Sequence, residues 1–411
     1  MRFDKNVVGL PAAYPRGFST RTAWKWPLVP ARQLIELHYG KALRADVRVA
    51  GAVPVYGTNG QCGWHDTPLA KGPGLILGRK GQGPLGVEWC DADYWVIDTA
   101  YYGSTLTPDV RLKYLYHLIK YIGLNHLKDG TSNPTLSRAA FGQQLFPLPN
   151  VAEQDAIVSI LGALDARIDL LRLTNITLES IARVLFKSWF VDFDPVRAKQ
   201  EGRSPEGMDE AAAARFPSGF EESELGLVPM GWRVGSLKEM CNIASGKRPS
   251  DRGDTLSQSC SVRLYGGAGI MGYTSASLFN GPRILTGRVG TLGKIHVAYP
   301  PFWASDNVLV LEPNDDVLFW FVLHRLRLID VLSLNRGSTQ PLLTQKDLGA
   351  QLGVIPSEAV LRKFSQMVSP LYEQIRMQDM RIETLMNLRD TLLPRLISGQ
   401  LRLPEAEALV A

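Results

Sequence analysis

The sequence predicts an α+β protein made of two mostly β domains, each followed by a long helix. Its 411 residues exceed what a single hydrophobic core usually holds. The stretch "VPVYGTNGQCGW" (53–64) returns as "VRLYGGAGIMGY" (262–273), with five identical positions in twelve. Each copy then ends in a long heptad pattern of apolar residues. A repeat with a period of half the chain indicates a duplicated domain rather than a solenoid.

The repeat extends through both β-rich segments at offsets of 206 to 209 residues. Gly40-Lys41 corresponds to Gly246-Lys247, and Gly78-Arg79 to Gly287-Arg288. Short β-rich runs are separated by glycine and proline, and 109–123 reads as a minor helix. We therefore predict a first domain at 1–149 and a second domain at 232–355.

The two long helices are predicted at 150–191 and 356–400, with Asn150 and Ser357 as helix N-caps. About 36 residues at 1.5 Å per residue give roughly 54 Å. One apolar stripe would stay exposed on a lone helix, so we expect each helix to pack against its copy. The predicted seam consists of Ile157, Leu161, Leu164, Ile168, Leu171, Leu178 and Leu185 in the first helix, and Phe364, Val368, Leu371, Ile375, Ile382, Leu385 and Leu392 in the second.

Polar segments complete the predicted organisation. Asn175 interrupts the first seam and either fixes the helix register or faces solvent where the seam ends. Residues 192–231 read as a polar, proline-containing connector, and 401–411 as a C-terminal tail. Trp26 and Trp232, which correspond across the repeat, are expected in the cores.

Composition excludes several classes of protein. There is no apolar run long enough to span a membrane, no signal-peptide core, and no cysteine or histidine spacing typical of zinc sites. We expect a cytoplasmic protein with reduced cysteines and no bound metal. The net charge is +5, and the excess positive charge lies in two blocks, 1–150 and 231–311. Such a distribution suits a polyanion such as DNA, although the excess is small.

No catalytic motif is evident. "GQGPLG" (81–86) formally matches a dinucleotide-binding fingerprint, but no helical pattern follows it and the second copy lacks it. A glycine-rich turn is the better interpretation. The chain has no P-loop and no methyltransferase Asn-Pro-Pro-aromatic motif. The six scattered histidines are interpreted as surface or packing residues.

Three segments carry a resemblance to a known family: "ARVLFKSWFVDFDPVRAK" (182–199), "SELGLVPMGW" (223–232) and "RDTLLPRLISGQLRL" (389–403). They resemble the hallmark segments of the specificity (S) subunit of type I restriction–modification systems. The resemblance implies two target-recognition domains and two helical spacers packed as an antiparallel coiled coil with pseudo-two-fold symmetry. Each domain would read one half of a bipartite site in double-stranded DNA.

The resemblance also implies partners and their cofactors. Two modification subunits, which are adenine methyltransferases, would bind the S subunit, and restriction subunits, which act as nuclease and translocase, would join them. The S subunit itself is expected to be non-catalytic and to bind no cofactor. S-adenosylmethionine, ATP and magnesium would be used by the partner subunits.

Sequence readout needs hydrogen-bonding side chains at base edges. The candidate DNA-binding residues are Lys41, Arg44, Tyr56, Asn59, Gln61, Arg79 and Lys80 in the first domain, and Lys247, Arg248, Arg252, Arg263, Tyr265, Arg288 and Lys294 in the second. Residues that recur in both copies could instead serve the framework or contact phosphate. A coiled-coil scaffold without DNA readout is the alternative function, and an unrecognised nuclease or methyltransferase is a second one.

Overall fold

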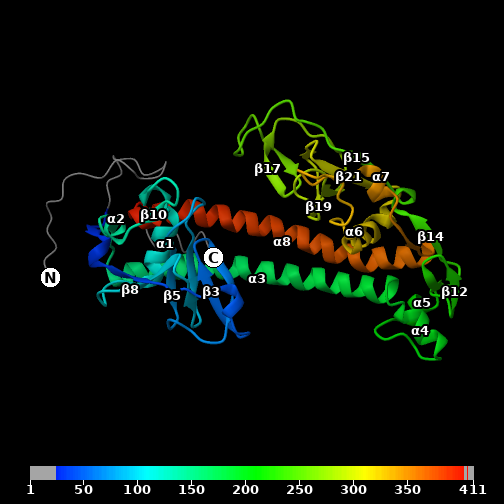
Figure 1. Cartoon of the computed structure of the whole chain (residues 1–411), viewed down its shortest axis with the longest axis horizontal. Coiled ribbons are helices and arrows are strands. Elements are labelled where there is room, and N and C mark those ends of the chain that lie inside the picture. Colours follow the sequence, from blue (N-terminus) through cyan, green and yellow to red (C-terminus); the bar gives the residue numbers. More distant parts are fainter. Residues whose placement is uncertain (1–24, 402–404, 406–411) are drawn as a thin grey trace. The chain divides into compact units, whose positions relative to one another are not determined.

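The computed structural model describes residues 25–401 and residue 405 (Figure 1). Residues 1–24 of the predicted first domain and 402–404 and 406–411 of the predicted tail lie outside the described residues. The chain forms two compact units, one of residues 1–172 with 379–411 and one of residues 173–378. Each unit therefore holds one β domain together with half of each long helix.

The β domain of the first unit contains two main sheets. A four-stranded antiparallel sheet has the order β2-β8-β5-β6, and a three-stranded sheet has the order β4-β3-β7, in which β3 and β7 are parallel. The strands are β2 Ile35–Tyr39, β3 Val53–Gly57, β4 Gly60–His65, β5 Gly74–Gly78, β6 Val87–Cys90, β7 Trp95–Val96 and β8 Ala100–Thr105. Two short pairs join β1 Leu28–Pro30 to β11 Leu145–Pro147, and β9 Lys128–Asp129 to β10 Thr135–Leu136; the helices are α1 Leu112–Ile122 and α2 Arg138–Gly142.

The β domain of the second unit repeats the two main sheets strand for strand. Its sheets have the orders β15-β21-β18-β19 and β17-β16-β20, again with one parallel pair in the smaller sheet. The strands are β15 Cys241–Ser245, β16 Val262–Gly266, β17 Gly269–Thr274, β18 Arg283–Gly287, β19 Ile295–Ala298, β20 Phe302–Ala304 and β21 Val308–Pro313. The pair β14 Arg233–Ser236 and β22 Leu352–Ile355 corresponds to β1 and β11, and the helices α6 Phe319–Leu328 and α7 Gln345–Gly349 correspond to α1 and α2.

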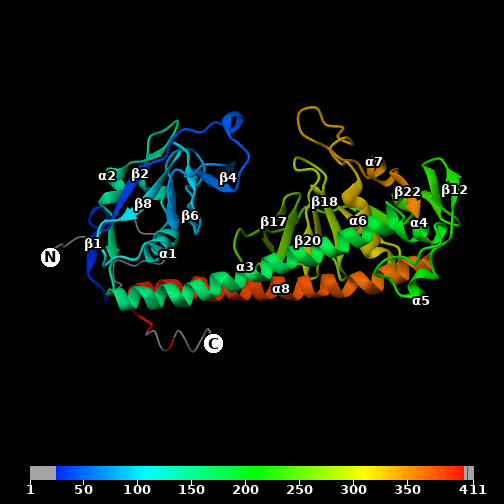
Figure 2. The ribbon, with the colours of Figure 1, turned by 90° about the horizontal axis from the view of Figure 1, so that it is seen from below.

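The long helices are α3 Val151–Phe190 and α8 Glu358–Ser398. Asn150 caps α3, because its side chain accepts from the Glu153 amide at 2.9 Å while Glu153 accepts in return from the Asn150 amide. In the first unit the beginning of α3 packs with the end of α8, as in the buried contacts of Leu161 and Leu396. In the second unit the end of α3 packs with the beginning of α8, as in Phe186 and Phe364. The helices are therefore antiparallel (Figure 2).

The predicted seam residues are all buried or half-buried in these contacts. Ile168, Leu171 and Ile382 form a separate small cluster beyond the cores of the β domains. Asn175 is half-buried, and Gln378, the polar position of the second heptad pattern, is buried. An apolar heptad stripe thus becomes buried on both helices, as expected for a coiled coil.

The segment 192–231 is more structured than a polar connector. It contains helices α4 Asp194–Gln200 and α5 Glu210–Ala213 and a hairpin of β12 Phe220–Ser223 with β13 Gly226–Pro229. Phe216 packs edge-on against Trp189 of α3, and buried Trp232 joins the same cluster. The apolar residues scattered in this segment explain the order, because they extend the core of the second unit. Trp26, the counterpart of Trp232, is only half-buried.

Candidate nucleic-acid interface

Three loops of the first β domain are hydrogen-bonded into one cluster. It joins the β3–β4 turn, the loop after β5 and the loop between β9 and β10. Thr58 donates its hydroxyl to the Lys80 carbonyl at 2.8 Å, and its own carbonyl accepts from the Gly86 amide at 2.8 Å. Gln82 donates to the Ser132 carbonyl at 2.7 Å. Bonds from the backbone, a threonine hydroxyl and a glutamine amide therefore hold the three loops together, and the polar side chains Asn59, Gln82 and Ser132 are exposed on them.

The second domain shares two backbone bonds with this cluster. The Gly290 amide donates to Pro341 at 2.9 Å, as Gly81 donates to Pro134 at 3.0 Å in the first domain. The Leu343 amide donates to the Arg288 carbonyl at 2.8 Å, as Leu136 donates to Arg79 at 2.7 Å. The residues that recur across the two copies thus mark the framework of these loops.

The recurring arginines Arg79 and Arg288 serve that framework. Arg79 donates to the Asp98 carbonyl at 2.9 Å, and Arg288 donates to the equivalent Asp306 carbonyl at 3.2 Å. The Arg79 guanidinium also lies over the Tyr39 ring, 4.8 Å from its centre. Both arginines are half-buried, so their repetition has a structural cause.

Main-chain hydrogen bonds also explain why the Gly-Lys pairs recur in both copies. The Lys41 amide donates to Val96 at 2.9 Å while the Lys41 carbonyl accepts from the Trp95 indole at 3.0 Å. Lys247 makes the equivalent bonds with Ala304 and Trp303. Both lysine side chains remain exposed. Exposed lysines of this kind suit contacts with phosphates, which bind Lys and Arg without reading sequence.

The remaining candidates divide by exposure. Arg44 is exposed but pairs with Asp46 at 2.8 Å, and Lys80 pairs with Asp98 at 2.9 Å. Tyr56 is buried, which raises the pKa of its phenol, and it packs edge-on against Tyr94; it is therefore a framework residue. Arg263 and Tyr265 are half-buried. The other exposed candidates are Asn59, Gln61, Arg248, Arg252 and Lys294.

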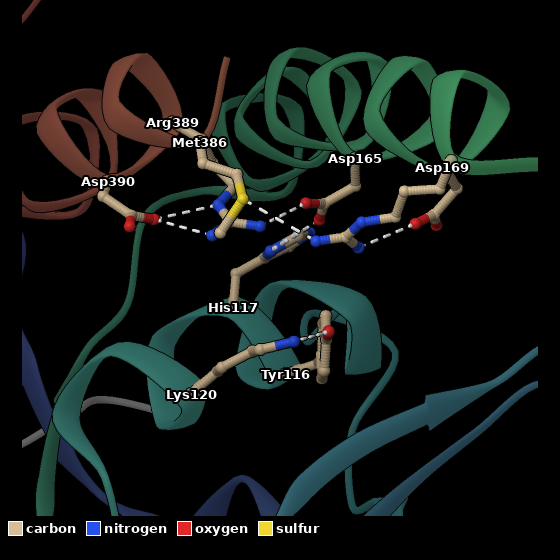
Figure 3. Close-up of polar contacts among 9 residues, drawn as sticks. Tyr116, His117, Lys120, Asp165, Asp169, Met386, Arg389 and Asp390 are labelled. Atoms are coloured by element: carbon tan, nitrogen blue, oxygen red, sulfur yellow. Dashed lines mark hydrogen bonds and ion pairs between the residues drawn. The ribbon is translucent and has the colours of Figure 1, made fainter. Parts of the chain in front are cut away.

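A polar joint that the sequence analysis missed connects α1 of the first domain to the long helices (Figure 3). His117 of α1 is buried, and its Nδ1 lies 4.0 Å from a carboxylate oxygen of Asp165 on α3. Arg389 of α8 donates to the other Asp165 oxygen at 2.8 Å and pairs with Asp390. Burial lowers the pKa of His117, and the Asp165 carboxylate opposes this shift.

The second domain has an equivalent joint built from different residues. His324 of α6, 207 positions after His117, lies 3.0 Å from the Tyr372 hydroxyl on α8. Arg327 donates to the same hydroxyl at 3.0 Å and pairs with Glu179 of α3. Trp320 stacks on Tyr372 with ring centres 4.0 Å apart. Both histidines are packing residues, which is one of the two roles that the sequence predicts for them, but their matching offset also marks them as equivalent positions.

Within residues 25–401, no group of three or more His, Cys, Asp or Glu side chains is placed to hold a metal ion. The cysteines are free thiols, of which Cys62 is exposed. No helix in the described part of the chain is long and apolar enough to cross a membrane.

Comparisons with known proteins agree with this architecture. The family model "Type I restriction modification DNA specificity domain" matches residues 86–180 and 229–357, one match per copy of the repeat. The MjaIX specificity subunit of a type I restriction enzyme from Methanocaldococcus jannaschii is 28% identical over 319 residues, 71% of this chain and 70% of that protein. The HindI specificity subunit from Haemophilus influenzae is 26% identical over 314 residues, 62% and 68% of the two chains.

The fold is similar to that of the solved S subunit of a type I restriction–modification system from M. genitalium. The TM-score is 0.57 at 18% sequence identity, over 92% of this chain and 97% of that one. This similarity bears on the fold alone.

Proposed function

Because the chain belongs to the type I restriction–modification DNA specificity family, we propose that its two β domains read the two halves of one bipartite DNA site. The chain is the recognition subunit of its system and not the catalytic one. The long helices would hold the two domains apart and so define the spacer between the half-sites.

The observation that carries this proposal is the duplication of the loop cluster on a duplicated fold. The two domains share strand order, backbone bonds and the positions of framework residues. Their exposed loop residues differ, for example Asn59 against Ala268 at equivalent hairpin turns. Two domains with a common framework and different exposed residues suit the reading of two different short sequences.

The partners follow from the same assignment. We propose that two modification subunits bind this chain and methylate adenines in the site, and that restriction subunits join them in the cytoplasm. S-adenosylmethionine, ATP and magnesium would be used by these partners. The purified chain alone should therefore neither methylate nor cleave DNA when these three are supplied, and turnover by the chain without partners would contradict the assignment.

The test of the function is to map methylated adenines in the DNA of cells that express this chain with its modification subunits. We expect one motif with two fixed half-sites and an unread spacer between them. Cells that express the modification subunits alone are the control and should lack the motif. A scaffold that does not read sequence predicts either no motif or the same methylation in the control.

A further inference from the structure

The smaller sheet of each β domain carries a β-bulge at the same place. In the β3–β4 hairpin the register shifts so that Val55 pairs with Gly63 and Tyr56 with Gln61, which leaves Cys62 as the extra residue. In the β16–β17 hairpin Leu264 pairs with Gly272 and Tyr265 with Ile270, which leaves Met271 as the extra residue. A bulge disrupts the ladder locally and changes the direction of nearby side chains.

An arginine from a preceding loop holds each bulge. Arg48 donates Nη1 to the Cys62 carbonyl at 2.7 Å, and Arg252 donates Nη2 to the Met271 carbonyl at 3.0 Å. The carbonyl of an extra residue lies outside the regular ladder, so a guanidinium is a suitable partner for it. The sequence repeat did not pair these arginines because they lie 204 positions apart, whereas the bulges lie 209 apart.

A glycine next to each bulge makes the arrangement possible. Gly63 has a φ of 153° and Gly272 a φ of 150°, backbone conformations that residues with a Cβ rarely adopt. A Cβ on Gly63 would overlap Arg48 Nη1, and a Cβ on Gly272 would lie 2.7 Å from the Gly253 carbonyl oxygen. The same three-part arrangement of bulge, arginine and glycine therefore occurs in both domains.

The residues that each bulge presents are exposed and differ between the copies. Both β4 and β17 are edge strands of their sheets. Gln61 and Cys62 are exposed in the first domain, and Ile270 and Met271 are 51% and 36% exposed in the second. Exposed apolar side chains on an edge strand are otherwise unfavourable, since edge strands usually carry charge or proline. Their presence at the bulge that carries Gln61 and Cys62 in the first domain indicates a surface that contacts a binding partner.

We propose that these arginine-held bulges are the sequence-reading elements, with Gln61 and Cys62 reading the first half-site and Ile270 and Met271 reading the second. A two-stranded β-ribbon fits the major groove of B-DNA. There the Gln61 amide can pair with the N6 and N7 edge of adenine, and the apolar Ile270 and Met271 suit the methyl group of thymine. Arg48 and Arg252 are positioning residues that fix the two bulges.

The inference rests on the proposed function. Its test exchanges the exposed residue pairs of the two bulges, Gln61 with Cys62 and Ile270 with Met271. One variant carries Gln61→Ile with Cys62→Met, and its mirror carries Ile270→Gln with Met271→Cys. Each variant puts into one bulge the residues that the same bulge already holds in the other domain, so the fold should tolerate them. Gln33→Ile is the control, because Gln33 is exposed in the first domain outside the hairpin.

Each variant is assembled with its modification subunits, and bound DNA is selected from pools in which one half-site is randomised. The first variant should change the preferred first half-site and keep the second half-site and the spacer. The mirror variant should change the second half-site and keep the first half-site and the spacer. The control should keep the parental motif. If both exchange variants selected the same half-site sequences as the parent, the inference would be overturned. The proposed function would fail separately, if the parent itself selected no bipartite motif.

The positioning role is tested with Arg48→Ala and Arg48→Lys. Arg48→Ala leaves the Cys62 carbonyl without its donor, so discrimination at the first half-site should fall by about tenfold, the scale of one good base contact. Lys can restore one donor and should recover part of this loss. A lower unfolding temperature with unchanged sequence preference in both variants would show that Arg48 stabilises the domain without positioning the bulge.

Discussion

At the scale of single residues, the repeated sequence positions prove to be those that serve the backbone. Gly40 and Gly246 recur because the chain passes against carbonyl oxygens there, and an added Cβ on either would overlap them. Arg79 and Arg288 recur because each donates to a backbone carbonyl, that of Asp98 before β8 and that of Asp306 before β21. A residue that is identical in both copies is therefore a poor candidate for base reading, since the proposed function has the two copies read different sequences.

Gly40→Ala should destabilise the first domain by about 1–3 kcal/mol, the usual cost of overpacking a site that cannot relax. The obstacle is the backbone oxygens of Val96 and Ile97, which cannot move aside as a flexible side chain could. Gly162→Ala is the matched control, because a Cβ there meets nothing within 4 Å inside α3. It should stabilise by roughly 0.5–1 kcal/mol. Urea unfolding of both variants measures the difference, and equal effects would contradict this assignment of Gly40.

At the scale of elements, the helices were predictable and the joints between helices and β domains were not. The heptad pattern gave α3 and α8 nearly to their ends, since a periodic apolar stripe over about 40 residues has few alternatives. The bulge arginines Arg48 and Arg252 could not be paired from sequence, because loops of different length precede them. His117 and His324 do share the offset of 207, but their partners Asp165 and Tyr372 differ in chemistry.

The joint at His324 predicts a dependence of stability on pH. Burial lowers the pKa of His324 from 6.5 to about 3, and Arg327 and Arg183 add to this shift. Between these values the unfolded chain binds a proton that the folded chain does not, so stability is lost as pH falls below 6.5. At pH 5 the loss is about 2 kcal/mol.

His324→Gln removes this group and should flatten the pH dependence of unfolding by that amount. The measurement is urea unfolding of parent and variant at pH 7 and pH 5. The comparison uses the difference between the two proteins at each pH, so that other titrating groups cancel. A parent and variant that lose the same stability between pH 7 and pH 5 would show that His324 is not kept neutral by the fold.

At the scale of the whole molecule, the β domains are proposed to read bases and the long helices to set the distance between the two half-sites. The loop clusters and bulges belong to the β domains, whereas the seam residues belong to helices that contain no candidate reading residue. Inserting residues into the helices should therefore change the length of the spacer and leave both half-site sequences unchanged. The duplication of the sequence makes equivalent insertion points available beside Asn175 in α3 and Ile382 in α8, 207 positions apart.

The most direct test is to insert four residues at both points and to map the methylated motif beside that of the parent. Coiled coils accept four-residue insertions by local unwinding. Each helix gains about 6 Å and turns about 40° beyond one full turn, while B-DNA rises about 3.4 Å per base pair. We expect both half-site sequences to persist with a spacer longer by one to two base pairs. A changed half-site with the parental spacer would contradict the account.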